Sequence, residues 1–80
     1  MRIETLRLAF DALEGEYGRF VGYAKDAMDD ALKAESRGDD EAERTMRAVS
    51  AYWDNRATEA LTALQEVQAA LDEAEKEVRE

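Results

Sequence analysis

Apolar residues recur along this chain with a seven-residue repeat, in two separate series. Steps of three and four residues alternate within each series, which is typical of a helix seam that faces another helix. The first series consists of Ile3, Leu6, Phe10, Leu13, Tyr17, Phe20, Ala24, Ala27, Ala31 and Ala34. The second consists of Met46, Ser50, Trp53, Ala57, Ala60, Leu64, Val67, Leu71, Ala74 and Val78. The pattern predicts an all-α protein built from two long helices.

The residues between the two series carry the signals of a helix end followed by a helix start. Gly38 suits the left-handed conformation that commonly ends a helix,. Asp39 or Asp40 is expected to cap the second helix, because a short acidic side chain accepts hydrogen bonds from free backbone N–H groups,. Asp40 with Glu43 resembles a capping box that has Asp in the Ser/Thr place,.

The chain is expected to form a single helical-hairpin domain over residues 1–80. We predict a helix over about 2–35, a turn at 36–40 and a second helix over about 41–78. A connection this short requires the two helices to run antiparallel.

The two apolar series fit each other in reverse, with large residues placed against small ones. This register places Trp53 opposite Ala24, and it also pairs Tyr17 with Ala60, Phe20 with Ala57, Met46 with Ala31 and Ile3 with Ala74. Alternation of large and small side chains across the seam is what close packing requires.

Further apolar residues lie beside the seam and widen the apolar stripe, mostly in the half near the turn. They are Val21, Tyr23, Met28, Leu32, Val49, Tyr52 and Leu61. A stripe of this width calls for additional helices to cover it. Small helical proteins often complete their core by oligomerising, so we expect self-association into a four-helix bundle. The alternative is that the stripe docks on a different protein.

Three glycines within the first predicted helix leave its continuity open. Each of Gly15, Gly18 and Gly22 costs about 1 kcal/mol relative to alanine in a helix interior,. One interpretation is a kink or break near Gly15–Gly18, which gives three helices at about 2–14, 19–36 and 40–79. A second is a smooth strip that a partner backbone approaches closely. A third is a tolerated and continuous helix.

The residue inventory argues against an enzyme. The chain has no Pro, no Cys and no His, which removes the usual general base, the usual nucleophile and the best transition-metal ligands,. Acidic clusters such as Asp26, Asp29 and Asp30 lack the spacing and glycine of a calcium loop,. We therefore expect no catalytic, cofactor-binding or metal-ligating residue and no cofactor.

The charge of the chain restricts its partners. There are 20 acidic and 11 basic residues, which gives a net charge of −9, and 12 of the acids follow Gly38. Such a chain should avoid nucleic acids and membranes directly and approach basic protein surfaces. No stretch is apolar enough for a signal peptide or a membrane span, so we expect a cytoplasmic protein. The high content of Arg and Ala hints at a bacterial or phage genome.

Two classes of function remain. The first is a non-enzymatic interaction or assembly protein that acts as a homo-oligomer, expected to be a dimer. The expected contacts with the partner, chosen because aromatic residues, Met and Arg are enriched in interfaces, are Tyr23, Met28, Leu32, Tyr52, Arg56 and Leu61,. The second class is a small acidic inhibitor of the phage or mobile-element type, in which carboxylates mimic nucleic-acid phosphates and block a basic protein. Its expected contacts are Glu73, Glu75 and Glu77.

Overall fold

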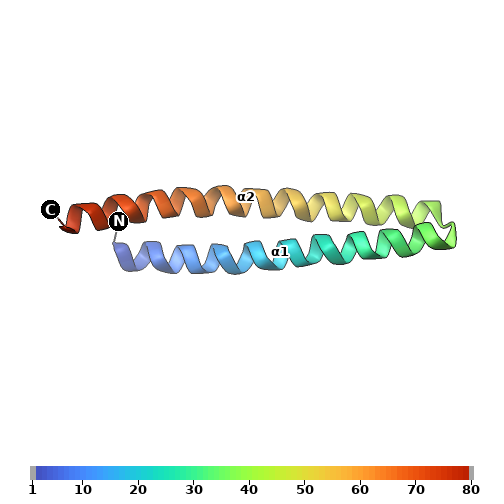
Figure 1. Cartoon of the computed structure of the whole chain (residues 1–80), viewed down its shortest axis with the longest axis horizontal. Coiled ribbons are helices and arrows are strands. Elements are labelled where there is room, and N and C mark those ends of the chain that lie inside the picture. Colours follow the sequence, from blue (N-terminus) through green and yellow to red (C-terminus); the bar gives the residue numbers. More distant parts are fainter. Residues whose placement is uncertain (1, 80) are drawn as a thin grey trace.

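The computed structural model describes residues 2–79, which form two long helices joined by a tight turn. Helix α1 spans Ile3–Arg37 and helix α2 spans Asp40–Arg79. The two helices run antiparallel, so that the hairpin is a rod of 63 × 13 × 13 Å (Figure 1). No strand occurs within residues 2–79. The expected all-α hairpin is therefore confirmed.

The turn is closed by a glycine in the left-handed conformation. Gly38 has φ 74° and ψ 20°, and its N–H donates to the carbonyl of Glu35 at 3.0 Å. The next N–H, of Asp39, donates back to the carbonyl of Ala34 at 2.9 Å. These two bonds form a Schellman motif, which satisfies carbonyls that the end of α1 would otherwise leave free.

Helix α2 begins with a side-chain cap from Asp39. Its Oδ1 accepts a hydrogen bond from the N–H of Ala42 at 3.1 Å. The expected capping box of Asp40 and Glu43 is wrong, because Asp40 is already the first helical residue. The Glu43 carboxylate instead accepts a hydrogen bond from Nε of Arg47 at 2.8 Å, one turn further along α2.

Helix α1 is continuous through its three glycines, so the alternative of a break near Gly15–Gly18 is wrong. Among the described residues, only Gly38 has a positive φ. Helix α1 lies alongside α2 over its length, and this tertiary packing offsets the low helix propensity of the glycines,. A Cβ built on Gly18 or Gly22 would meet nothing within 4 Å, so contacts within the chain do not require glycine there.

Replacing Gly18 and Gly22 together by alanine is expected to stabilise the hairpin by about 1–2 kcal/mol. Alanine lowers the entropy of the unfolded chain and fits into open space in the folded one,. Urea unfolding at a fixed chain concentration measures the change. The matched contrast is Gly38→Ala, which should destabilise by about 1 kcal/mol because of its positive φ,. A loss of stability in Gly18→Ala/Gly22→Ala would contradict the open space around both positions.

Contacts across the seam place Trp53 near the level of Ala24, as the sequence predicts. The Trp53 ring lies 4.9 Å from the ring of Tyr23, the neighbour of Ala24. The hydroxyl of Ser50 donates to the backbone carbonyl of Ala24 at 2.9 Å. A serine side chain reaches a carbonyl of the facing helix only where the two backbones approach closely, which the small side chain of Ala24 allows.

The core is thin. Its buried members are mainly alanines, with three leucines towards the open end: Leu6, Ala24, Ala27, Ala31, Ala34, Ala57, Ala60, Leu64 and Leu71, together with Ser50. Among the described residues, no large side chain is completely buried. Two helices alone enclose a seam but cannot surround a bulky residue.

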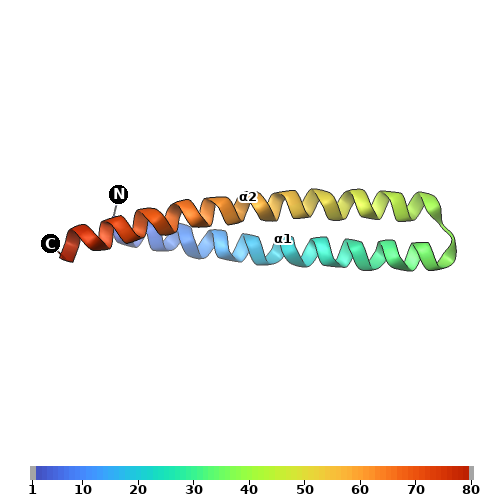
Figure 2. The same cartoon turned by 45° about the horizontal axis from the view of Figure 1, so that its top comes forward.

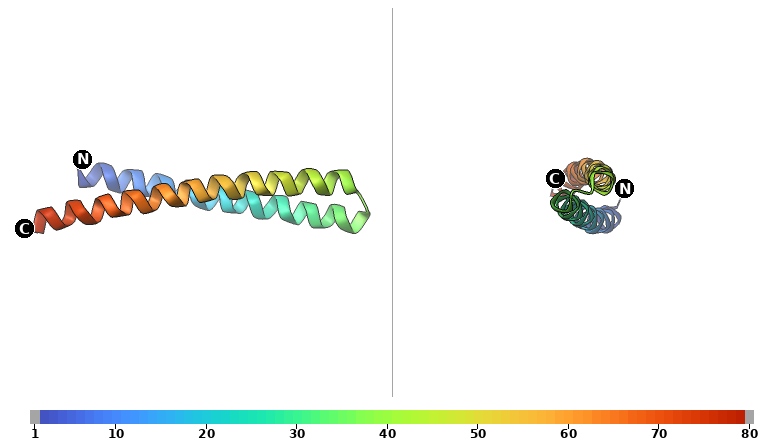
Figure 3. Two further views of the ribbon diagram at one scale, coloured as in Figure 1. Left: turned by 90° about the horizontal axis from the view of Figure 1, so that it is seen from above. Right: turned by 90° about the vertical axis from the view of Figure 1, so that its right-hand side faces the viewer.

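The two rods wind partly around each other, as expected for a seven-residue repeat. Figure 3 shows this from above, where the rods cross, and in the end-on view. Helix α2 has five more residues than α1 (40 against 35) and extends past the start of α1 at the open end (Figure 2). The hairpin thus presents two long edges, one on each side of the seam.

Candidate interaction surface

The first edge of the seam is formed by aromatic residues and an arginine. We call it the aromatic edge and define it by Phe20, Tyr23, Tyr52, Trp53 and Arg56. The Trp53 ring lies 5.5 Å from the ring of Phe20 and 4.9 Å from the ring of Tyr52. Tyr23 and Tyr52 remain 45% and 51% exposed. Trp53 therefore anchors a cluster whose outer rings face solvent.

Arg56 is held in place within this edge by three contacts. Its guanidinium lies 5.4 Å from the centroid of the Phe20 ring, a cation–π geometry,. Nη1 donates to the hydroxyl of Tyr52 at 3.4 Å, and Nε lies 3.7 Å from the Glu59 carboxylate. Arg56 and the rings thus form an ordered surface that combines planar apolar groups with hydrogen-bonding groups.

The second edge is aliphatic, and we define it by Val21, Met28, Leu32 and Leu61. Leu32 is 49% exposed, and Val21 and Leu61 are also exposed. Beside them, the guanidinium of Arg47 reaches from α2 to α1, where it contacts the Sδ of Met28 at 3.7 Å and the carboxylate of Glu35 at 3.3 Å.

The six expected contact residues lie on different edges. Tyr23 and Met28 are five residues apart on α1, which turns them about 140° from each other around the helix. Tyr52 and Arg47 have the same separation on α2. Tyr23, Tyr52 and Arg56 therefore belong to the aromatic edge, whereas Met28, Leu32 and Leu61 belong to the aliphatic edge. One flat partner surface cannot touch both sets at once.

The three expected acidic contacts do not form one surface either. The carboxylate of Glu75 lies 3.3 Å from Nη2 of Arg7, in an ion pair that links the two helices. Glu73 and Glu77 are exposed and four residues apart, so they share one side of α2, while Glu75 lies between them in sequence and points elsewhere,. A continuous row of phosphate-mimicking carboxylates would need all three on one side.

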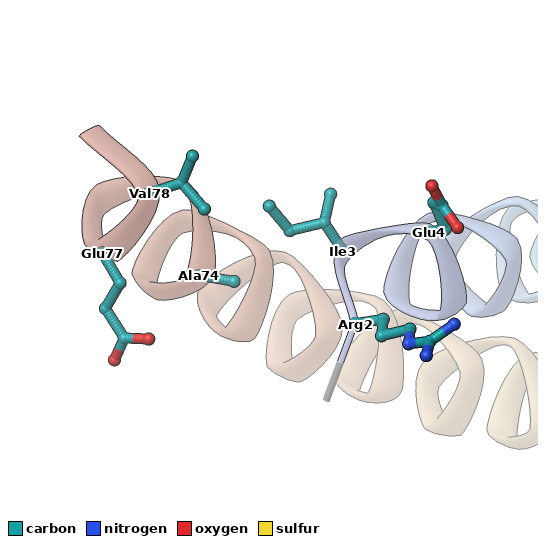
Figure 4. Close-up of a pocket in the computed structure, with 6 residues that line it drawn as sticks. All are labelled: Arg2, Ile3, Glu4, Ala74, Glu77 and Val78. Carbon is teal, nitrogen blue, oxygen red and sulfur yellow. The ribbon is translucent and has the colours of Figure 1, made fainter. Parts of the chain in front are cut away.

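A shallow depression marks the open end of the hairpin (Figure 4). Ile3, Ala74 and Val78 supply its apolar part, and Arg2, Glu4 and Glu77 complete the lining. Figure 4 shows Ile3 and Val78 on the same side of the helices, with the Glu77 carboxylate directed away from them. The depression is wide open, and its charged lining consists of one base and two acids.

Neither a metal cluster nor a membrane span is found in the described part of the chain. Within residues 2–79, no three acidic side chains converge in a way that would hold a metal ion. None of the helical segments there combines the length and apolar character needed to cross a membrane.

Sequence reasoning assigned Phe20 and Trp53 to the seam alone and missed their contribution to the surface. Both side chains are only half-buried. A signal for this surface was present in the sequence. Tyr52 is next to Trp53 and lies four residues before Arg56, and residues four apart on a helix are neighbours, so an exposed cluster around Trp53 could have been predicted,. Comparison with protein-family models, with curated proteins and with solved structures found no match for this chain.

Proposed function

We propose that this chain is a non-enzymatic interaction or assembly protein that acts by self-association of its hairpin. The observation that carries the proposal is the incomplete burial of its apolar residues. No large side chain is completely buried within the described residues, and exposed apolar or aromatic residues line both edges of the seam. A bundle of four helices, made from two hairpins, would cover one of these edges on each copy.

The surface area of the hairpin supports the same proposal. The chain exposes 5908 Å² to solvent. A compact monomer of 9.0 kDa is expected to expose about 4,900 Å². The excess of about 1,000 Å² is comparable to the roughly 800 Å² that each partner buries in a stable protein–protein complex. Association of two copies would therefore bring the exposed area per chain close to that of an ordinary small domain.

The proposal predicts that the purified chain is a dimer at micromolar concentration. Sedimentation equilibrium over a wide concentration range measures its mass. The dissociation constant should change little with added salt, because apolar contacts are not screened. A monomer at every concentration would overturn the proposal.

The alternative is an acidic inhibitor that binds a basic protein. The observation in its favour is the row formed by Glu59, Glu66 and Glu73, which are all exposed and recur every seven residues along one side of α2. Binding through this row should weaken steeply as salt is added. Replacing Glu66 and Glu73 by Gln would abolish such binding, whereas it would leave an apolar self-association largely intact.

A further inference from the structure

We infer that the second copy docks on the aromatic edge, in the same direction, so that α1 of each chain lies against α2 of the other. This inference rests on the proposed function and specifies its interface. Such a dimer has a two-fold axis parallel to the rods and places both turns at one end. Three observations support this arrangement: the residues of the edge, the polar contacts across the seam, and the charges along each helix.

The aromatic edge has the composition of an interface centre. Tyr, Trp and Arg are the residues that most often dominate binding energy, because they bury large rigid surfaces and retain polar groups. Here Trp53 holds Tyr23 and Tyr52 in place, and Arg56 is fixed by its contacts with Phe20 and Tyr52. Side chains that are already ordered lose little further entropy when a partner covers them.

The aliphatic edge is partly closed within the chain. Both ion pairs that link α1 to α2 in the described residues lie on this side of the seam, Arg7 with Glu75 and Arg47 with Glu35. Arg47 also covers Met28. A partner docking there would have to displace or bury these charged groups, which is costly. No interhelical ion pair of the described residues lies on the aromatic edge, so the edge is open to a partner.

The net charge beside the aromatic edge differs between the two helices. Within α2, the acidic residues that share a side with Tyr52 and Arg56 by seven-residue spacing are Glu59, Glu66, Glu73 and Glu77, so this side has four acids against one base, Arg56. Within α1, the basic residues on the corresponding side are Arg19, Lys33 and Arg37, against three acids, Glu16, Asp26 and Asp30, and Arg2 precedes the helix at its N-cap. This side of α1 is thus neutral, and that of α2 is net −3 within residues 40–79.

This difference favours the same-direction arrangement. When α1 faces the partner's α2, Arg19 lies at about the level of the second copy's Glu59, because Arg56 already contacts Phe20 within one chain. Arg2 would approach the second copy's acidic residues at the open end in the same way. An opposite-direction dimer would set α2 against α2, where the four acids face a helix with one base on that side. Such complementarity fixes the register of an interface more than its affinity.

The edge is tested by two matched charge substitutions, Tyr52→Glu and Leu61→Glu. Both residues are exposed, so each variant should keep the helical content of the parent chain, and Tyr52→Glu should lose about 1 kcal/mol of hairpin stability with its ring contacts to Trp53,. Sedimentation should show that Tyr52→Glu raises the dissociation constant by about 30-fold or more, as expected for a central interface residue. Leu61→Glu should leave it within about threefold. Dissociation by Leu61→Glu, with Tyr52→Glu still a dimer, would overturn the choice of edge.

The direction is tested with a spin label at Ser36→Cys. The natural chain has no cysteine, so the label is attached at this position alone. In the same-direction dimer both labels lie at the turn end, within about 30 Å of each other, because neighbouring helix axes are about 8–10 Å apart. In the opposite direction they would be separated by most of the 63 Å rod. A long distance overturns the inferred direction but leaves the proposed self-association standing, whereas a monomeric parent chain overturns both.

Discussion

Replacing Trp53 by alanine is expected to destabilise the hairpin by about 2–3 kcal/mol. A fully buried Trp loses about 3–5 kcal/mol on truncation, and Trp53 is half-buried, so the lower value applies,. The substitution removes the ring that contacts Phe20, Tyr23 and Tyr52, and nothing within two helices can collapse into the space. Urea unfolding at fixed chain concentration, followed by circular dichroism, measures the loss.

Tyr52→Ala is the matched control for this prediction. Tyr52 is half exposed and contacts the same Trp53 ring, so at a chain concentration low enough to keep the protein monomeric its loss should cost about 1 kcal/mol,. Trp53→Phe should recover part of the stability, because a smaller ring still stacks on Phe20. Equal losses for Trp53→Ala and Tyr52→Ala would show that the cluster is not organised around Trp53.

Replacing Ala31 by aspartate is expected to cost about 3 kcal/mol or more. Ala31 is 0% exposed and lies in the run of buried alanines of the seam. A carboxylate placed there loses its hydration without gaining a partner. Thermal unfolding at neutral pH measures the effect.

The pH dependence of Ala31→Asp identifies the cause of the loss. Burial raises the pKa of the new carboxyl above its unfolded value. Its charge therefore destabilises the folded state fully at neutral pH, and the difference from the parent chain should shrink as the pH falls towards about 4. Ala51→Asp, at an exposed position on α2, is the control and should cost only about 0.7 kcal/mol through helix propensity,. Equal losses for the two variants would contradict the burial of Ala31.

The arrangement of the hairpin could be predicted largely from local signals. The repeat from Ile3 to Ala34 predicts a helix, and Gly38 predicts its end, because few other residues adopt a positive φ at low cost,. The register also follows from the two apolar series. When they are aligned in reverse, the small Ala24 lies at the same level as the large Trp53. What local signals left open was the continuity of α1 through Gly15 and Gly18. Their low helix propensity is outweighed by packing against α2, which a local pattern does not measure.

The candidate surface could be predicted only in part. The residue types of an interface were recognisable, and Tyr23, Tyr52 and Arg56 do lie together. Met28, Leu32 and Leu61 were grouped with them because all six lie beside the seam. The five-residue separation of Tyr23 and Met28 already places them on opposite flanks of α1, and the grouping by closeness to the seam overlooked it,. In the structure, the side of α1 that carries Tyr23 meets the side of α2 that carries Tyr52 and Arg56. The side of α1 that carries Met28 and Leu32 meets the side of α2 that carries Leu61.

The sequence by itself determined that the chain is helical, that it doubles back at Gly38, and that Trp53 lies near the level of Ala24. These follow from residue periodicity and from the conformational freedom of one glycine, both of which act over a few turns of chain. Only the tertiary structure decided which charged residues pair across the seam and therefore which edge is crossed by ion pairs. Arg7 forms an ion pair with Glu75 only when the two helices are packed. The distance between the two side chains depends on how each helix is rotated about its own axis.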